Sequence, residues 1–204
     1  MDAESSGKGD LTPKGRLMRD RIVEATADRV FRLGAADTSL DDVRREIGAS
    51  KSQLYHYFSS KDELLQAVID LQGQRIMGAQ QPELASIDSF ESLRRWRDKI
   101  IQLAESHGKI GGCPIGSLAN ELAPHDPSHR AALAVEFDHW EEQLKQAFAR
   151  MQARGVLAAR FSPKQLGHLF LMTLQGGLLF VKLQQSSEPL AVALDDLIRM
   201  LEAS

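Results

Sequence analysis

The chain has 204 residues, a length that suits one large domain or two smaller ones. Its formal net charge at pH 7 is −3. Hydrophobic residues make up 43% of the chain and charged residues 26%, so it can bury a core, which excludes an intrinsically disordered protein. Its single cysteine excludes an internal disulfide and a thiolate zinc cluster. The charge balance also excludes purely electrostatic binding of nucleic acid, so any such binding must depend on local arrangement.

Residues 1–11 are rich in Ser, Gly and Asp and predict a flexible tail. They contain no apolar run of the kind found in a secretory signal, and no part of the chain has the roughly 18 to 20 uninterrupted apolar residues that cross a bilayer. Together with the lone cysteine, this predicts a cytoplasmic protein with no membrane segment.

Apolar residues recur at helical spacing along nearly the whole chain, with Gly and Pro as breaks and no run of alternating β-branched residues. This pattern predicts an all-α fold. The first helix is expected to begin with Thr12 as its N-cap and Pro13 in its first turn. Its apolar stripe runs from Leu17 to Leu33, and Gly34 is expected to end it.

Two short helices are expected next, separated by a turn. Thr38 precedes Asp41 at capping-box spacing, which predicts the start of a helix that Gly48 closes. Ser50 can then cap a third helix, expected over residues 51–58. The buried positions of this helix pair are expected to be Leu40, Val43, Ile47, Leu54 and Phe58.

Further apolar stripes, divided by proline and glycine, predict six more helices. They are expected at about residues 62–80, 88–108, 114–123, 128–154, 163–186 and 189–203. We therefore expect three parts in the chain: the tail at 1–11, a three-helix domain at 12–60 and a larger helical domain at 61–204.

A short capped helix, a glycine-containing turn and a second short helix form a helix-turn-helix, a motif whose second helix lies in the DNA major groove. On the outward face of residues 51–58, Gln53 can pair with an adenine edge and Tyr55 can meet base edges or sugars. Phosphate contacts are expected from Ser50, Lys51, Ser52, His56, Tyr57 and Lys61. The alternative is a helical hairpin that serves packing alone, since Leu54 and Phe58 are core residues under both interpretations.

Three runs of sequence carry a resemblance to a known family: TSLDDV at residues 38–43, IGASKSQLYHYF at 47–58 and SKDELL at 60–65. The segment 12–68 resembles the DNA-binding domain of TetR-type transcriptional regulators. The resemblance implies an all-helical homodimer whose three N-terminal helices bind a double-stranded DNA operator, with a connecting fourth helix and a C-terminal core that binds a small effector. It also implies a repressor that an inducer releases from DNA. By motif position, the family's DNA contacts carry over to Thr38, Lys51, Ser52, Gln53, Tyr55, His56, Tyr57 and Lys61.

The C-terminal segments GGCPIGSLA at 111–119 and QGG at 175–177 look like a branch of the family whose ligands are uncharacterised or of the multidrug type. Because the candidate side chains are mostly aromatic or sulfur-containing, the implied effector is small and largely apolar. The alternative is that the stripe from Phe137 to Met151 is ordinary helix packing. Ligand contacts are expected from Trp96, Cys113, Phe137, Trp140, Met172 and Gln175.

The last two predicted helices carry more apolar surface than one buried stripe requires. We therefore expect a homodimer that forms through these helices, where Gly176 and Gly177 allow close approach of two backbones. The alternative is a single large core within one chain.

One cysteine and three histidines are candidates for thiol reactivity or metal binding. Cys113 stands directly before a predicted helix start, where the helix dipole can favour its thiolate, so it is a candidate sensor of electrophiles or oxidants. The alternative is a small buried residue. His125, His129 and His139 are candidate metal ligands, but Pro127 breaks the helical spacing of the first two, and we expect surface loop residues with no metal and no cofactor.

Two other classes of function are alternatives to a regulator. An enzyme would need Cys113 with His107 or His125, but no nucleophile elbow, phosphate-binding glycine loop or metal-carboxylate cluster surrounds them, so no enzyme is expected. A ligand-carrying or interaction protein with a vestigial helix-turn-helix is the second alternative. Salt-dependent operator binding that weakens when Lys51 or Tyr57 is replaced separates it from a regulator.

Overall fold

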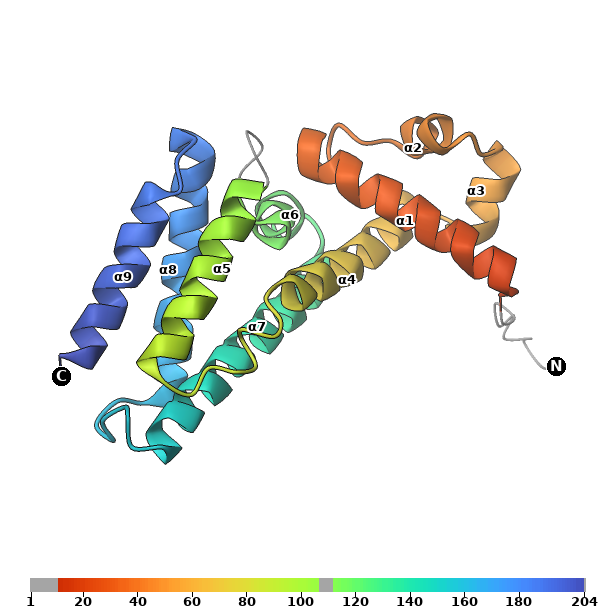
Figure 1. The fold of residues 1–204 in the computed structure, drawn as a ribbon. Coiled ribbons are helices and arrows are strands. Elements are labelled where there is room, and N and C mark those ends of the chain that lie inside the picture. Colours follow the sequence, from red (N-terminus) through yellow and green to blue (C-terminus); the bar gives the residue numbers. More distant parts are fainter. Residues whose placement is uncertain (1–10, 107–111, 204) are drawn as a thin grey trace. The chain divides into compact units, whose positions relative to one another are not determined.

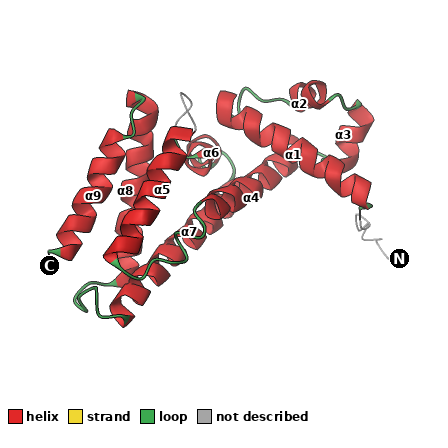
Figure 2. Cartoon of the chain, viewed as in Figure 1, coloured by secondary structure: helices red, strands yellow, loops and turns green. Residues whose placement is uncertain are grey.

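The computed structural model describes residues 11–106 and 112–203. These residues form helices joined by short loops and contain no strand (Figure 2), which confirms the all-α prediction. Residues 1–10 of the predicted tail lie outside the described residues. The helices in Figure 1 are α1 (Pro13–Leu33), α2 (Leu40–Ile47), α3 (Lys51–Tyr57), α4 (Lys61–Ala79), α5 (Phe90–Ser106), α6 (Pro114–Leu122), α7 (Pro127–Ala153), α8 (Pro163–Gln184) and α9 (Glu188–Glu202).

The chain divides into two compact units, which meet between Leu71 and Gln72. The boundary lies within α4, whereas the sequence analysis places it just before that helix. The first part of α4 belongs to the N-terminal unit because Leu64 and Leu65 are buried there and line the same interior space as Val43. Burial of these side chains joins the start of α4 to the three helices before it.

Both ends of α1 and the C-terminal end of α2 follow their predicted signals, but the apolar stripe of α1 is shorter than expected. Thr12 Oγ1 accepts a hydrogen bond of 3.1 Å from the backbone N–H of Gly15, as an N-cap should. Gly48 ends α2 in the left-handed conformation, with φ of 69°. Leu17 and Leu33 are exposed, contrary to the prediction. The buried residues of α1 are Ile22, Val23, Thr26, Ala27 and Val30.

The start of α2 differs from the prediction by one residue. Its capping box consists of Ser39 and Asp42: Ser39 Oγ accepts from the Asp42 N–H at 3.1 Å, and Asp42 Oδ2 accepts from the Ser39 N–H at 3.2 Å. The predicted pairing of Thr38 with Asp41 is wrong because Thr38 is buried and its hydroxyl donates to the carbonyl oxygen of Gly34 at 2.8 Å. Hydrogen bonding to Ser39 is the first cause that lowers the pKa of Asp42.

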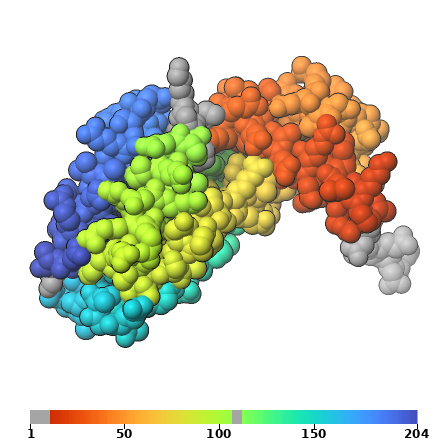
Figure 3. Space-filling model, in the orientation of Figure 1, coloured from red at the N-terminus to blue at the C-terminus, as the bar shows by residue number. Residues whose placement is uncertain are grey.

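The C-terminal unit is a helical bundle in which α8 packs on α7 and α9, α5 packs on α9, and α6 packs on α7. Figure 3 shows the surfaces of α5 and α9 on its visible face. An aromatic cluster fills the interior: the ring of Phe170 lies 4.8 Å from that of Phe148 and 6.5 Å from that of Trp96, centroid to centroid. The ends of the predicted C-terminal helices agree closely with the observed ones wherever they fall on described residues.

The three glycines of α8 lie in different surroundings. A Cβ added to Gly167 would lie 3.0 Å from the backbone nitrogen of Lys145, so α7 and α8 approach each other closely there. A Cβ on Gly177 would collide with the side chain of Leu190 in α9. A Cβ on Gly176 would meet nothing within 4 Å. Gly177 therefore serves packing within the chain, whereas Gly176 faces outward.

Helix α8 is the one described helix that is long and apolar enough to cross a membrane, since an 18-residue stretch of it has a mean hydropathy of 1.4. The core helix of a water-soluble protein can be equally long and apolar, and 44% of this stretch is buried within the chain. Its other apolar side chains form an outward stripe along one face of the helix. We call this the α8 stripe: Leu169, Met172, Gly176, Leu179, Phe180 and Leu183.

Candidate nucleic-acid interface

Helix α3 presents nearly all of its side chains to solvent because only one of them anchors it. Leu54 is 1% exposed and, with Phe58 directly after the helix, holds α3 to the rest of the N-terminal unit. Tyr57 is half-buried. This arrangement leaves an outward face that suits a helix lying in a groove. The exposed residues of α3 are Lys51, Ser52, Gln53, Tyr55 and His56.

The start of α3 is fixed by a capping box between Ser50 and Gln53. Ser50 Oγ accepts from the Gln53 N–H at 3.1 Å, and Gln53 Oε1 accepts from the Ser50 N–H at 2.9 Å. The hydroxyls of Ser50 and Ser52 lie 3.0 Å apart and share a hydrogen bond. The predicted cap at Ser50 is confirmed, and it also involves Gln53, which the sequence analysis assigned to base contact alone.

Two side-chain pairs order the outward face of α3. The ammonium of Lys51 lies 5.9 Å from the centre of the Tyr55 ring, within the range of a cation–π contact. The rings of His56 and Tyr57 meet edge to face with centroids 4.9 Å apart. The face therefore carries a cation held over an aromatic ring.

Thr38 and Lys61, both predicted to contact DNA, are occupied within the chain. Thr38 is buried beneath the turn before α2, so its side chain is not part of the surface that α3 presents. The ammonium of Lys61 donates to the carbonyl oxygen of Ala35 at 2.6 Å and keeps its remaining hydrogens for other acceptors. Lys61 thus ties the start of α4 to the loop that follows α1.

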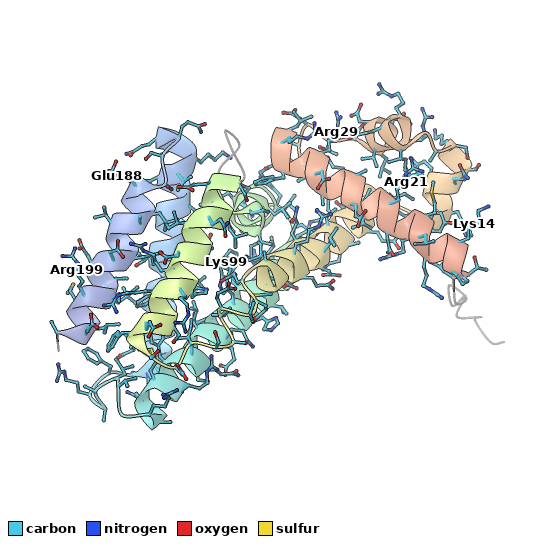
Figure 4. All side chains as sticks on the ribbon, in the orientation of Figure 1. Lys14, Arg21, Arg29, Lys99, Glu188 and Arg199 are labelled. Carbon is cyan, nitrogen blue, oxygen red and sulfur yellow. The ribbon has the colours of Figure 1, made fainter. Side chains whose placement is uncertain are left out.

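Several arginines of the N-terminal unit hold helices together instead of facing outward. Arg29, which Figure 4 labels on α1, pairs with Asp42 and Glu46 of α2 at 3.7 and 3.6 Å. Arg45 differs from these, because it pairs with Asp42 within α2 at 2.8 Å and its side chain stays 67% exposed. The most specific of these contacts was missed by the sequence analysis: Arg21 Nη2 donates to the carbonyl oxygen of Ile47 at 3.1 Å and so holds the turn before α3. No spacing rule connects residues so far apart in the sequence.

The six predicted ligand residues of the C-terminal unit lie in different environments. Trp96, Cys113 and Trp140 are buried, and Phe137 and Gln175 are half-buried. Met172 lies apart from these residues, since it is 48% exposed on the α8 stripe. The indole N–H of Trp96 donates to Gln80 Oε1 at 3.0 Å. Trp96 therefore has its polar group satisfied already.

One of these residues, Trp140, carries a buried N–H group, Nε1, with no hydrogen-bond partner in the described part of the chain, whereas the side chain of Gln175 hydrogen-bonds the thiol of Cys113. Trp140 is 3% exposed. Gln175 lies beside α6, since a Cβ on Gly116 would come within 2.9 Å of Gln175 Oε1. Unpaired buried donors are rare in folded proteins, and such a group can take an outside acceptor, such as a water or an atom of a ligand.

Cys113 is buried, and burial raises the pKa of its thiol, although hydrogen bonds from the backbone of Gly116 and the side chain of Gln175 act in the opposite direction. Burial therefore acts against the thiolate that the helix start was expected to favour. His129 is also buried, inside the first turn of α7, and not in a surface loop as expected. His125 and His139 are exposed, and His107 lies outside the described residues.

Sequence comparison identifies the two parts of the chain separately. Residues 22–68 match the family described as Bacterial regulatory proteins, tetR family. Residues 89–195 match the family described as Transcriptional regulator LmrA/YxaF-like, C-terminal domain. The first match contains α3 and the turn before it. The second contains all six predicted ligand residues, from Trp96 to Gln175 and including Met172.

Several curated proteins are similar to this chain over most of its length. The transcriptional regulator AcuR of Cereibacter sphaeroides is 27% identical over 90% of this chain and 85% of that protein. The uncharacterized HTH-type transcriptional regulator YxaF of Bacillus subtilis is 29% identical over 84% of this chain and 88% of that protein. The HTH-type transcriptional repressor DhaR of a Mycobacterium species is 24% identical over 85% and 86%, respectively. These relatives are named as regulators of transcription and not as enzymes.

Solved structures share the fold. The regulatory protein TetR from Rhodobacter sphaeroides aligns with a TM-score of 0.80 at 24% identity, covering 90% of this chain and 98% of that one. The reduced form of Escherichia coli NemR aligns with a TM-score of 0.74 at 19% identity, covering 90% and 96%. At these identities the likeness concerns the fold alone, and the family follows from the two sequence matches. The helix-turn-helix and the helical C-terminal unit thus have one common explanation: the chain belongs to the TetR family of transcriptional regulators.

Proposed function

We propose that this protein is a homodimeric, cytoplasmic repressor that binds a pseudo-palindromic operator through two copies of α3 and is released by a small, largely apolar effector. The observation that carries the DNA-binding part is the division of α3 into one buried anchor, Leu54, and an outward face of polar and aromatic residues. A helix that served packing alone would bury more than one side chain. The mycobacterial relative is named a repressor, which supports this direction of control.

The residues of α3 are assigned two kinds of contact. Lys51, Ser52, His56 and Tyr57 contact phosphates, which positions the protein without selecting a sequence. Gln53 and Tyr55 contact base edges and supply the selection. Thr38 and Lys61 keep a supporting role, since one is buried and the other holds a backbone carbonyl.

Dimer formation is supported by the α8 stripe, and α9 carries two more exposed apolar side chains, Val192 and Met200. Apolar residues repeated along one exposed helix face are typical of a surface that a partner covers. Gly176 lies in the middle of the stripe and leaves room for a second backbone. Operator binding by such a dimer requires its two α3 helices to enter successive major grooves, about 34–36 Å apart.

Replacing Lys51 by Ala is expected to weaken binding to all duplexes alike, because a phosphate contact carries no sequence information. The slope of log affinity against log salt should fall by about one for each half-site. Fluorescence anisotropy with an operator duplex and a random duplex over a salt series measures both effects. Arg45→Ala removes the same charge from a side chain already paired with Asp42, so it is the matched control. Equal losses in the two variants would contradict the assignment of Lys51.

The effector site is proposed for the C-terminal unit, around the unpaired donor of Trp140. Donors without a partner in an apolar interior favour a ligand that is mainly apolar and carries one acceptor, such as a carbonyl oxygen. Such a ligand induces release only if it binds better to the conformation that does not bind DNA.

Trp140→Phe is expected to abolish the advantage of ligands that carry an acceptor, because it keeps an aromatic ring and removes the N–H. Thermal-shift titrations with acetophenone and its hydrocarbon analogue ethylbenzene measure that advantage. The preference for the ketone should fall by roughly five- to tenfold, the usual effect of one buried hydrogen bond. Trp96→Phe is the matched control, since its N–H is already bound to Gln80. The site assignment is wrong if both variants keep the same preference as the unmodified protein.

A further inference from the structure

The orientation of the Gln53 side-chain amide is fixed by its own helix. The backbone N–H of Ser50 donates to one atom of this amide at 2.9 Å. Since a backbone N–H can only donate, the atom that receives it must be the oxygen, Oε1. A second bond, from the Gln53 N–H to Ser50 Oγ at 3.1 Å, closes the box and holds the side chain against the start of α3. The amide nitrogen, Nε2, has no partner among the described residues and is left for an outside acceptor.

This orientation changes what Gln53 can recognise. Pairing of glutamine with adenine requires Nε2 to donate to N7 and Oε1 to accept from the amino group on C6. In this protein Oε1 already accepts from the Ser50 N–H with one of its two lone pairs, which holds it toward the start of α3, so an adenine amino group must reach the other lone pair in that fixed position. A donor-only amide faces no such constraint with a base that presents an oxygen.

Bases in the major groove fall into two groups for such a donor. Guanine presents O6 and N7, and thymine presents O4, so both offer an acceptor at the position where adenine and cytosine carry an amino group. An amino group facing the Gln53 NH2 brings two donors together. We propose, on the basis of the proposed operator binding, that Gln53 acts as a donor-only reader that selects a keto base, guanine or thymine, on the strand it contacts.

The test begins with duplexes selected from a randomised pool by the full-length protein. If no selected duplex binds the unmodified protein better than random duplexes, the proposed function fails, and the reading by Gln53 fails with it. Otherwise, every position of the selected duplex is changed to each of the four base pairs, and affinities are measured for the unmodified protein and for Gln53→Ala. At one position per half-site the unmodified protein should favour keto over amino bases by roughly five- to tenfold, and Gln53→Ala should lose this preference alone.

Gln53→Glu supplies the matched variant. Its carboxylate still accepts from the Ser50 N–H, so the start of α3 is kept, but it has no hydrogen to donate. The preference at the same position should therefore reverse toward adenine or cytosine, while binding to all duplexes weakens because the new charge repels phosphate. Circular dichroism should show unchanged helix content in both variants.

Two results would overturn the inference while leaving the proposed function intact. The first is a preference for adenine at the Gln53-dependent position that is lost when the adenine is replaced by purine without its amino group. That result requires Oε1 to accept from the base. The second is that Gln53→Ala leaves the base preferences unchanged at every position. That result would mean that Gln53 does not contact a base.

Discussion

Leu179→Glu is expected to convert the protein into a monomer and to weaken operator binding by roughly 10²- to 10⁴-fold. Leu179 is 53% exposed in the single chain and lies near the middle of the α8 stripe. In the proposed dimer its side chain is covered by the partner, so a carboxylate there must be buried without a counter-charge, which is strongly unfavourable. Loss of the partner then leaves one α3 helix to bind a half-site alone.

Sedimentation or light scattering measures the change in mass, and binding to the selected operator measures the change in affinity. Val135→Glu is the matched control, because Val135 is 63% exposed on α7 and does not belong to the stripe. It should leave both the mass and the affinity unchanged. A dimer that persists in Leu179→Glu, with normal operator affinity, would contradict the proposed interface.

Leu54→Ala is expected to lower the free energy of unfolding of the N-terminal unit by about 2–5 kcal/mol, the usual range for a buried leucine that leaves a cavity. Leu54 is 1% exposed and is the only fully buried side chain within α3. Its loss should release α3 from the unit. Denaturant unfolding followed by circular dichroism measures the change.

The neighbouring substitution Tyr55→Ala separates stability from recognition. Tyr55 is 47% exposed, so its removal should change the free energy of unfolding by no more than about 1 kcal/mol, most of it from the contact with Lys51. Affinity for the selected operator should nevertheless fall. If Tyr55→Ala destabilises the protein as much as Leu54→Ala, α3 is a packing element and the assignment of its outward face is incorrect.

Much of the fold could be predicted because its signals are local. Thr12, Gly48 and Ser50 act at helix ends, where one residue and its near neighbours determine the structure. The start of α2 shows the limit of such signals. Both Thr38 with Asp41 and Ser39 with Asp42 have the spacing of a capping box, and the choice depends on the burial of Thr38, which is a tertiary property.

The candidate sites were harder to predict because they depend on contacts between distant residues. Arg29 pairs with α2 and Arg21 bonds to the carbonyl oxygen of Ile47, so two side chains that look available in the sequence are engaged within the chain. The burial of Cys113 reverses the expected effect on its pKa. Apolar periodicity places Met172 on a helix face but does not say whether that face turns inward.

The adjacent glycines of α8 imply that association and folding can be redesigned separately. Gly177 packs against α9 of its own chain, whereas Gly176 lies on the outward α8 stripe, which the proposed dimer would cover. Complementary changes on that outer face should therefore yield two versions of the protein that pair with each other and not with themselves. Such heterodimers would carry two different α3 helices and recognise asymmetric operators, with the interior of each chain untouched.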